Sequence, residues 1–210
     1  MDVVSAHITK NDIGVQSTMD AGVPISLIVA CDIKGGIAKD GQIPWHYPQE
    51  LKYFSKITST TQDPTKINAI IMGRKTWDSL PRKPLPNRIN IIISRDISRK
   101  EKPSDNVVWS QSMEEAVKYV KSNSQIEDTY VIGGESIYSY VINNHYSQNM
   151  RGYHIHRLYY TEIHHDFQCD QFFPIKWFEN QPQFTKSSTP PSLPEFTYHI
   201  YENKNLQKYI

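Results

Sequence analysis

The 210-residue chain has few of the features that mark specialised classes of protein. Only two cysteines occur, Cys31 and Cys169, so there is no disulfide framework and no zinc-ligand cluster, and a reducing compartment is expected. Lysine and arginine number 23 against 22 aspartate and glutamate, and this balance excludes a large basic field for nucleic acid or an anionic membrane. No apolar run is long enough to span a bilayer. We expect a cytoplasmic protein without a resident metal, in which locally placed basic residues hold any anionic ligand.

The first 24 residues have no continuous apolar segment and contain three aspartates, so they resemble neither a secretory nor a mitochondrial signal. We expect residues 1–24 to form a partly flexible N-terminal extension. Residues 25–203 are expected to form one domain, since the chain is long enough for one substantial core, and residues 204–210 a C-terminal tail.

Short runs rich in isoleucine and valine alternate with helical stretches, which indicates an α/β protein whose sheet is covered on both faces. The predicted strands are 25–31, 68–72, 89–94, 107–110, 129–132, 157–161 and 196–202. The predicted helices are 48–58, 74–80, 113–121 and 135–143. The last strand alternates between polar and apolar residues and would suit the edge of a sheet.

Segment 43–54, which reads IPWHYPQELKYF, places one carboxylate among apolar side chains. Pro48 suits the first turn of a helix, and from that start Glu50, Leu51 and Phe54 can face one cleft. A glutamate that faces an apolar wall is costly unless a cationic, hydrogen-bonding ligand fills the cleft. Taken alone, the segment favours a glutamate at the solvent edge of an ordinary amphipathic helix, because glutamate is mostly exposed.

Two junctions between a strand and a helix contain glycine, and both are candidates for phosphate binding. At Gly133-Gly134, backbone amides can approach a phosphate at the positive end of a helix. The motif is weak, because such pairs are often only tight turns and the G-x-G-x-x-G pattern is absent. After Gly73, a helix begins with Arg74 and Lys75, whose charges oppose the helix dipole. An anion between them explains this arrangement, although a solvated basic patch is the alternative.

Several independent motifs, in their order along the chain, resemble the dihydrofolate reductase family: 25–31, 35–41, 43–54, 70–77, 84–88 and 131–138. The resemblance covers the chain from about Ile25 to Asn203. It implies a dihydrofolate reductase-like three-layer α/β/α fold, with a predominantly parallel central sheet and an antiparallel C-terminal edge strand. It also implies an enzyme that reduces 7,8-dihydrofolate to 5,6,7,8-tetrahydrofolate with NADPH, in support of one-carbon metabolism and thymidylate synthesis.

The resemblance assigns three catalytic residues and a substrate site. Glu50 would bind the pterin 2-amino group and N3, Thr161 would hydrogen-bond to Glu50, and Trp45 would hold an ordered water through its indole N–H. Arg88 would bind the α-carboxylate of the glutamyl tail through its bidentate guanidinium. The remaining substrate-binding residues implied are Ile28, Val29, Ala30, Ile43, Leu51, Phe54, Leu85, Ile132 and Tyr138.

The resemblance likewise implies a site for NADPH, with a cis peptide bond between Gly133 and Gly134 beside the nicotinamide. Ser94 and Arg95 would hold the 2′-phosphate, while Gln111 stands where some relatives have a further arginine, which weakens the grip. The cofactor-binding residues implied are Ala30, Ile37, Gly41, Gly73, Arg74, Lys75, Thr76, Ser94, Arg95, Ile132, Gly133, Gly134, Glu135, Ser136, Ile137 and Tyr138.

In the implied mechanism, hydride passes from nicotinamide C4 to pterin C6, and N5 gains a proton. Glu50 would lie too far from N5 to donate directly, so a water near Ile43 and Trp45 is expected to deliver it. The loop 36–43 is expected to close over the nicotinamide. Ala38 stands in it where most family members have glycine, and a positive φ there would cost about 1 kcal/mol or more.

Two alternatives stay open at this stage. One is a pyrimidine reductase of riboflavin biosynthesis with the same fold, and the other is a non-catalytic module that binds folate or a nucleotide. The expected partners are dihydrofolate and antifolates, and a fused or associated thymidylate synthase is a further hypothesis. Glu50 beside Trp45, and Arg88 after Leu-Pro-Asn, favour the folate reductase over both alternatives.

Overall fold

The computed structural model describes residues 22–96, 105–145, 152–188 and 193–205. The predictions for residues 1–21 and 206–210, at the two ends of the chain, lie outside the described residues. The first strand, β1, begins at Val23. The last two residues assigned to the N-terminal extension therefore belong to the sheet.

The described residues form one eight-stranded sheet in the order β5-β4-β3-β6-β1-β7-β10-β9. Its strands are β1 (Val23–Cys31), β3 (Ile67–Gly73), β4 (Arg88–Ile93), β5 (Val107–Ser110), β6 (Ile126–Val131), β7 (Tyr153–Ile163), β9 (Phe184–Ser188) and β10 (Phe196–Asn203). All neighbours from β5 to β7 pair in parallel. Each predicted strand is present, and the largest difference is at β7, which begins four residues before the predicted 157.

The antiparallel C-terminal strand is confirmed, since β10 runs antiparallel to β7. Its predicted place at the edge is wrong, because β9 pairs with its other side, also antiparallel. β9 reads FTKSS and has a single buried apolar residue, Phe184. So polar a sequence resembles a loop, and β9 was not among the predicted strands.

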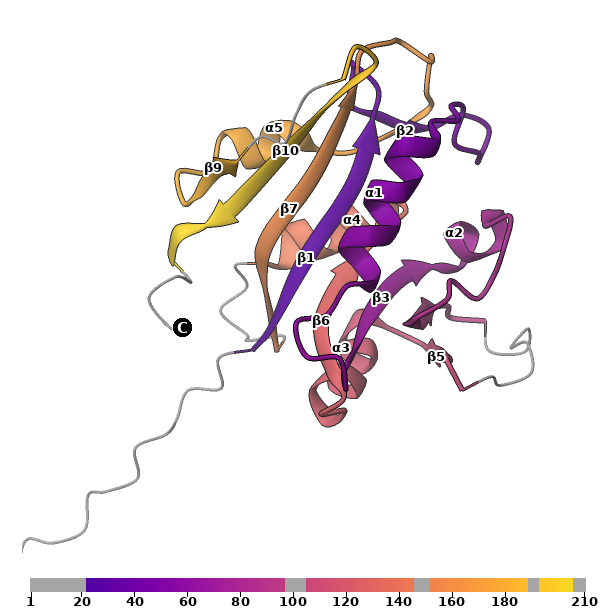
Figure 1. Ribbon diagram of the computed structural model, residues 1–210, viewed down its shortest axis with the longest axis vertical. Coiled ribbons are helices and arrows are strands. Elements are labelled where there is room, and N and C mark those ends of the chain that lie inside the picture. The colour runs from indigo at the N-terminus through magenta and orange to yellow at the C-terminus, as the bar shows by residue number, and fades with distance from the viewer. Residues whose placement is uncertain (1–21, 97–104, 146–151, 189–192, 206–210) are drawn as a thin grey trace, which may run out of the picture.

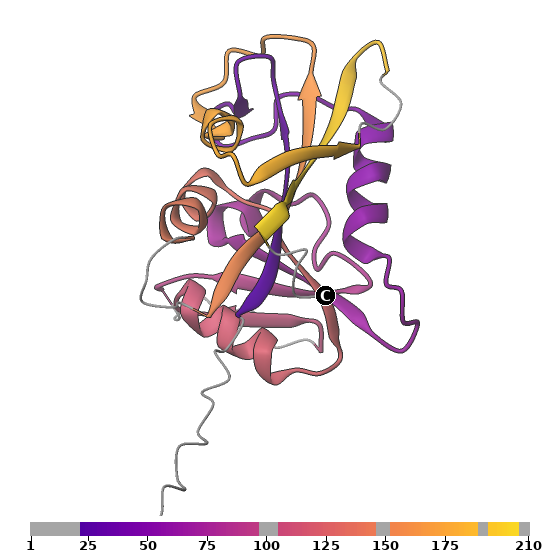
Figure 2. The same cartoon turned by 90° about the vertical axis from the view of Figure 1, so that its left-hand side faces the viewer.

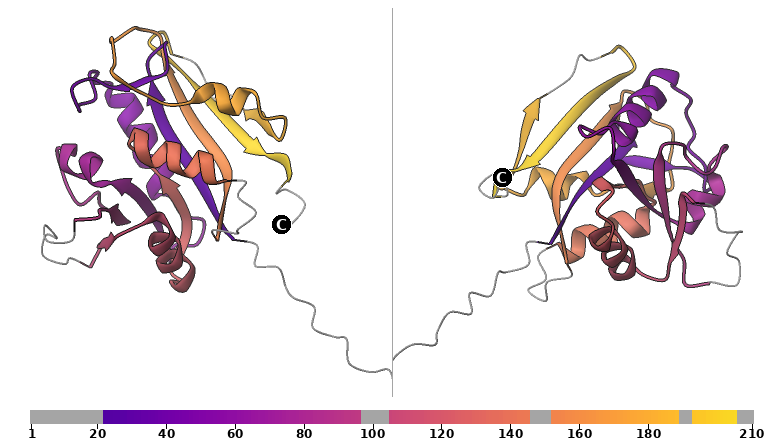
Figure 3. Two further views of the ribbon diagram at one scale, coloured as in Figure 1. Left: turned by 180° about the vertical axis from the view of Figure 1, so that it is seen from behind. Right: turned by 60° about the horizontal axis from the view of Figure 1, so that its bottom comes forward.

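The four predicted helices are present, and a fifth was missed. They are α1 (Pro48–Ser59), α2 (Arg74–Ser79), α3 (Met113–Ser122), α4 (Glu135–Asn144) and the unpredicted α5 (Ile175–Glu179). Figures 1 and 3 show α1 on one face of the sheet and α3 and α4 on the other, and Figure 2 shows α1 and α4 on opposite sides of the strands. This is the predicted three-layer arrangement. Among the described residues, no helix is both long enough and apolar enough to cross a bilayer.

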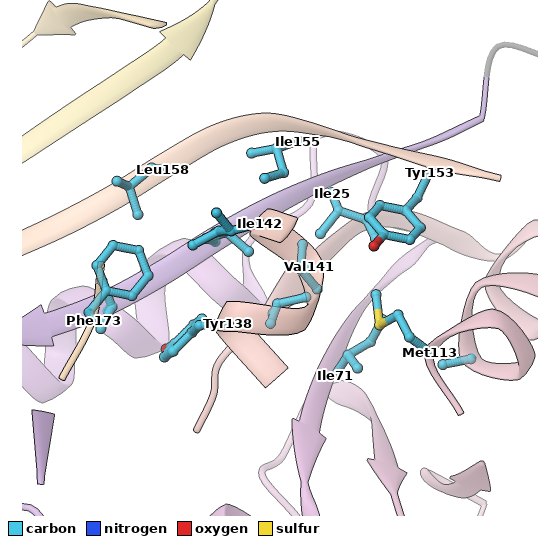
Figure 4. Close-up of a cluster of buried hydrophobic side chains, with 14 of the residues drawn as sticks. Ile25, Ile71, Met113, Tyr138, Val141, Ile142, Tyr153, Ile155, Leu158 and Phe173 are labelled. Atoms are coloured by element: carbon cyan, nitrogen blue, oxygen red, sulfur yellow. The ribbon is translucent and has the colours of Figure 1, made fainter. Parts of the chain in front are cut away.

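The central strands are buried on both faces because alternate side chains enter different cores. Along β1, Leu27 and Val29 join the cluster under α3 and α4, whereas Ile28 joins the cluster under α1 and α2. Figure 4 shows α4 against β1 and β7, with Tyr138 pointing toward Phe173; the two rings pack edge to face at 5.1 Å. This packing holds the start of α4 at the end of β6. Cys31 is fully buried.

A second, two-stranded sheet pairs β2 (Gly36–Ala38) with β8 (Gln171–Phe172). It corrects the expectation of strain at Ala38. Among the described residues other than glycine, positive φ angles occur at Asp40, Asn87 and Gln168. Ala38 is an ordinary strand residue, and its carbonyl accepts a hydrogen bond from the Asp170 amide at 2.9 Å. The alanine therefore carries no backbone strain.

Candidate active site

Glu50 lies in the first turn of α1 and is 8% exposed. The Thr161 hydroxyl, on the central strand β7, donates a hydrogen bond to Glu50 Oε1 at 3.4 Å. Burial raises the pKa of Glu50 from 4.5 to about 7, and the hydrogen bond from Thr161 opposes this rise. The alternative of a glutamate at the solvent edge of the helix is therefore excluded. Glu50 and Thr161 were both predicted from the sequence, and the fold brings them together across 111 residues of chain.

Two large apolar residues, one before and one after Glu50 in the sequence, are exposed. Ile43 is 63% exposed and Leu51 is 48% exposed, although both are large and apolar. Trp45 is partly buried, with its ring 5.2 Å from that of Phe167. Exposed apolar residues beside a buried carboxylate suit a cleft that a flat, apolar ligand with a polar edge would fill.

Arg88 is 2% exposed, although it begins strand β4. Its Nη1 donates to the Thr58 hydroxyl at 2.7 Å and its Nε donates to the Pro86 carbonyl at 2.9 Å. Within the described part of the chain, no carboxylate forms an ion pair with Arg88, and desolvation lowers its pKa. The guanidinium also lies over the ring of Phe54, 5.8 Å from the centroid, so it lies on the same side of α1 as Phe54. A buried cation without a carboxylate partner favours an anionic ligand.

Two residues that support this region were missed from the sequence. Thr58 is fully buried, and its hydroxyl donates to the Phe54 carbonyl at 2.8 Å while it accepts from Arg88. Asn90, also fully buried, receives a hydrogen bond from the Leu85 amide and donates one to the Leu85 carbonyl. Its signal was readable, since one asparagine among the isoleucines of segment 89–93 needs a polar partner inside the core.

The two glycine junctions meet in space, at the starts of α2 and α4. The amide of Gly73 donates to the carbonyl of Gly133 at 2.7 Å. Gly133 has φ +112°, and a Cβ there would lie 3.1 Å from the Tyr138 ring. A Cβ at Gly134 would lie 3.2 Å from the Thr76 hydroxyl oxygen. The Gly133–Gly134 peptide bond is cis, as the resemblance implied. Only residues without a side chain fit this junction comfortably.

The basic residues of the second junction need a correction. Arg74 pairs with Asp78 at 3.3 Å and with Asp96 at 3.7 Å, so two carboxylates already account for part of its position at the start of α2. Ser94 is buried, and its hydroxyl donates to the Asp96 carbonyl at 3.0 Å. Lys75 and Arg95 are exposed. A bound anion is therefore not needed to explain the position of Arg74.

The other predicted site residues differ in burial. Tyr138 is 3% exposed and donates its hydroxyl to the Ile28 carbonyl at 2.7 Å, so it belongs to the core behind Gly133. The remaining buried residues are Ile28, Val29 and Ile37; the partly buried ones are Ala30, Phe54, Leu85, Ile132 and Ile137; and Gly41, Glu135 and Ser136 are exposed. Their assignments to substrate or cofactor stay predictions.

A mostly parallel α/β sheet, with a buried carboxylate and two glycine-lined helix starts beyond the ends of its strands, is the architecture of an enzyme that binds a nucleotide beside a small substrate. Comparison with known proteins makes the class specific. A model of the family described as dihydrofolate reductase matches residues 24–202. The chain belongs to the dihydrofolate reductase family and is an oxidoreductase.

Three relatives illustrate the similarity. A dihydrofolate reductase of Aedes albopictus is 40% identical over 187 residues, which cover 84% of this chain and 96% of the relative. One of Drosophila melanogaster is 35% identical, with 88% and 97% covered. A bifunctional dihydrofolate reductase-thymidylate synthase of Daucus carota is 38% identical over 71% of this chain, and the match covers 28% of that longer protein.

Proposed function

We propose that the protein catalyses the NADPH-dependent reduction of 7,8-dihydrofolate to 5,6,7,8-tetrahydrofolate. The observation that carries the proposal is the buried Glu50, 8% exposed and hydrogen-bonded to Thr161. A buried carboxylate is matched by a ligand edge with two N–H donors, and the pterin 2-amino group and N3 provide such an edge. The buried Arg88 supports the same substrate, because folates carry a carboxylate on the glutamyl tail.

Protonation of pterin N5 makes C6 a better hydride acceptor, and the side chains near Glu50 are arranged for proton delivery. The pKa of Glu50, raised by burial to about 7, lets this carboxyl exchange a proton near neutral pH. Glu50 reaches N5 through a water that the Trp45 indole N–H holds. Ile43, Leu51 and Phe54 pack around the ring system and exclude bulk water.

When bound, NADPH would supply the hydride from nicotinamide C4 to C6. Gly73, Gly133 and Gly134 fit such a cofactor, because a side chain at any of them would crowd its neighbours, whereas glycine leaves the backbone open to a close approach. Ser94 and Arg95 would hold the 2′-phosphate and so favour NADPH over NADH. The neutral Gln111 would make that preference weaker than a further arginine would.

The proposed activity would supply tetrahydrofolate to one-carbon metabolism and thymidylate synthesis. Dihydrofolate and antifolates are the proposed ligands, and the cytoplasm is the proposed location. A fused or associated thymidylate synthase is a further proposal, supported by the bifunctional relative from Daucus carota.

The experiment is a spectroscopic assay of NADPH oxidation on addition of 7,8-dihydrofolate, with methotrexate as the control. The proposal predicts oxidation that depends on dihydrofolate and that stoichiometric methotrexate abolishes. NADPH oxidation only with a pyrimidine intermediate of riboflavin synthesis, without tight methotrexate binding, would contradict it. Binding of both ligands without turnover would identify a non-catalytic module and would also contradict it.

A further inference from the structure

Asp32 is a buried carboxylate directly after β1 that the proposed reaction does not use; it is 1% exposed. Its Oδ1 accepts hydrogen bonds from the amides of Lys34 at 2.9 Å and Gly36 at 2.8 Å, which close the turn between β1 and β2. Its Oδ2 accepts from the Phe167 amide at 3.2 Å. The Cys169 thiol also hydrogen-bonds to the carboxylate. One side chain therefore joins the β1–β2 turn to the segment that follows β7.

Phe167, whose amide Asp32 holds, also packs against Trp45. The Phe167 ring lies 5.2 Å from the Trp45 ring, with the two planes at 53°. Trp45 stands in the segment between β2 and α1, five residues before Glu50. The position of Phe167 therefore determines one side of the space that the Trp45 indole can occupy.

The segment held by Asp32 is packed tightly against β2. A Cβ at Gly36 would lie 2.3 Å from Cys169 Cβ and 2.9 Å from Asp32 Oδ2. Beyond this contact, the amide of Asp40 donates to Asp170 Oδ2 at 2.9 Å. With so little free space, we expect the loss of one hydrogen bond to Asp32 to shift the residues next to it, Phe167 among them.

We propose that Asp32 is a positioning residue, which acts through Phe167 to orient Trp45 for proton delivery. The inference rests on the proposed function, in which Trp45 holds the water that protonates pterin N5. Asp32 itself contacts neither substrate nor cofactor in this account. Its role is to keep Phe167 in one place while the cleft fills and empties.

The decisive variant is Asp32→Asn. Its side-chain oxygen can still accept from the amides of Lys34 and Gly36, but its amide group cannot accept from the Phe167 amide. We expect kcat to fall roughly tenfold, because small displacements of catalytic groups are costly, while KM for dihydrofolate and NADPH stays unchanged. Asp166→Asn is the matched control, since it removes a half-buried carboxylate of the same segment that pairs with Lys34 at 2.7 Å. This control should leave kcat unchanged.

Phe167→Leu tests whether the effect passes through the ring. It should lower kcat in the same way as Asp32→Asn, and the double variant should be no slower than either single variant, because both break one connection. Additive losses, or wild-type kcat in Asp32→Asn, would overturn the proposal. A parallel rise in KM for both ligands would also overturn it, because that result indicates general loosening of the fold.

The fluorescence of Trp45 in the unliganded protein separates this inference from the proposed function. The contribution of Trp45 is obtained by subtracting the spectrum of a matched Trp45→Phe variant in each background. Asp32→Asn should shift this contribution to longer wavelength, as the indole becomes more hydrated, and Asp166→Asn should not. If the wild type fails to reduce dihydrofolate, the proposed function fails, while the spectra still test the link from Asp32 to Trp45. An unchanged Trp45 spectrum in Asp32→Asn overturns the inference, whatever the wild-type activity.

Discussion

Glu50 carries a large electrostatic cost in the unliganded protein, because burial raises its pKa from 4.5 to about 7 while, among the described residues, Thr161 alone donates a side-chain hydrogen bond to it. Arg88 carries the corresponding cost for a cation, because it is buried and its hydrogen bonds go to neutral oxygens. A ligand with N–H donors at one end and a carboxylate at the other relieves both costs at once. In the proposed function, these two residues would set both the affinity and the orientation of the substrate.

The pH dependence of stability tests the burial of Glu50. An acid whose pKa is higher in the folded state makes folding less favourable as the pH rises from 4.5 to about 7, and the loss is complete above that range. Glu50→Gln removes this dependence. The free energy of unfolding of the variant minus that of wild type should therefore be roughly 3 kcal/mol larger at about pH 8 than at about pH 4, so the variant gains relative stability as the pH rises. Chemical denaturation measures both proteins, and a difference that does not change with pH would show that Glu50 is solvated.

Arg88→Leu tests the proposed carboxylate site. Folates with a glutamyl carboxylate should bind roughly 100-fold more weakly, since a buried charge-assisted contact is lost. A 2,4-diaminopyrimidine without a carboxylate should bind as it does to wild type, because it contacts only the end of the cleft near Glu50. Calorimetric titration of both ligands makes the comparison. Equal weakening of the two would mean that Arg88 acts only by supporting the fold.

At the scale of elements, the starts of α2 and α4 meet through the hydrogen bond from Gly73 to Gly133. Each helix is held by its own core: Trp77 of α2 is buried on the α1 side of the sheet, and Tyr138 of α4 on the other side. The sheet thus places two helix N-termini at one end, where a nucleotide phosphate would be most favourably bound.

Gly133→Ala tests this junction. The φ of +112° and the 3.1 Å approach to Tyr138 make alanine strained and crowded, so the unfolding free energy should fall by about 1–3 kcal/mol and NADPH binding should weaken. Gly41→Ala is the control, because Gly41 also has a positive φ, +75°, but nothing lies within 4 Å of its Cβ position. Thermal unfolding should show a smaller effect for the control, while NADPH titration compares Gly133→Ala with wild type, because Gly41 is itself an implied cofactor-binding residue. Equal effects would mean that crowding by Tyr138 contributes nothing.

For the whole molecule, apolar periodicity was sufficient to predict the parallel strands and four helices, because both faces of the sheet are buried. The same periodicity did not predict the short elements β2, β8, β9 and α5. These elements depend on partners distant in the sequence and are too short to have a clear apolar period of their own. At the site, the contact of Glu50 with Thr161 was predicted through the family resemblance. Thr58 and Asp32 were not, because their burial depends on partners distant in the sequence, Arg88 for Thr58 and Phe167 for Asp32.

The central claim is that the buried carboxylate of Glu50 holds the substrate ring and assists its protonation. The most direct measurement is the single-turnover rate of NADPH oxidation with dihydrofolate in wild type and Glu50→Gln near neutral pH. The account predicts that the variant loses at least about 100-fold in rate, the scale of general acid–base catalysis, while its affinity for NADPH is unchanged. A variant that turns over at the wild-type rate would contradict the account.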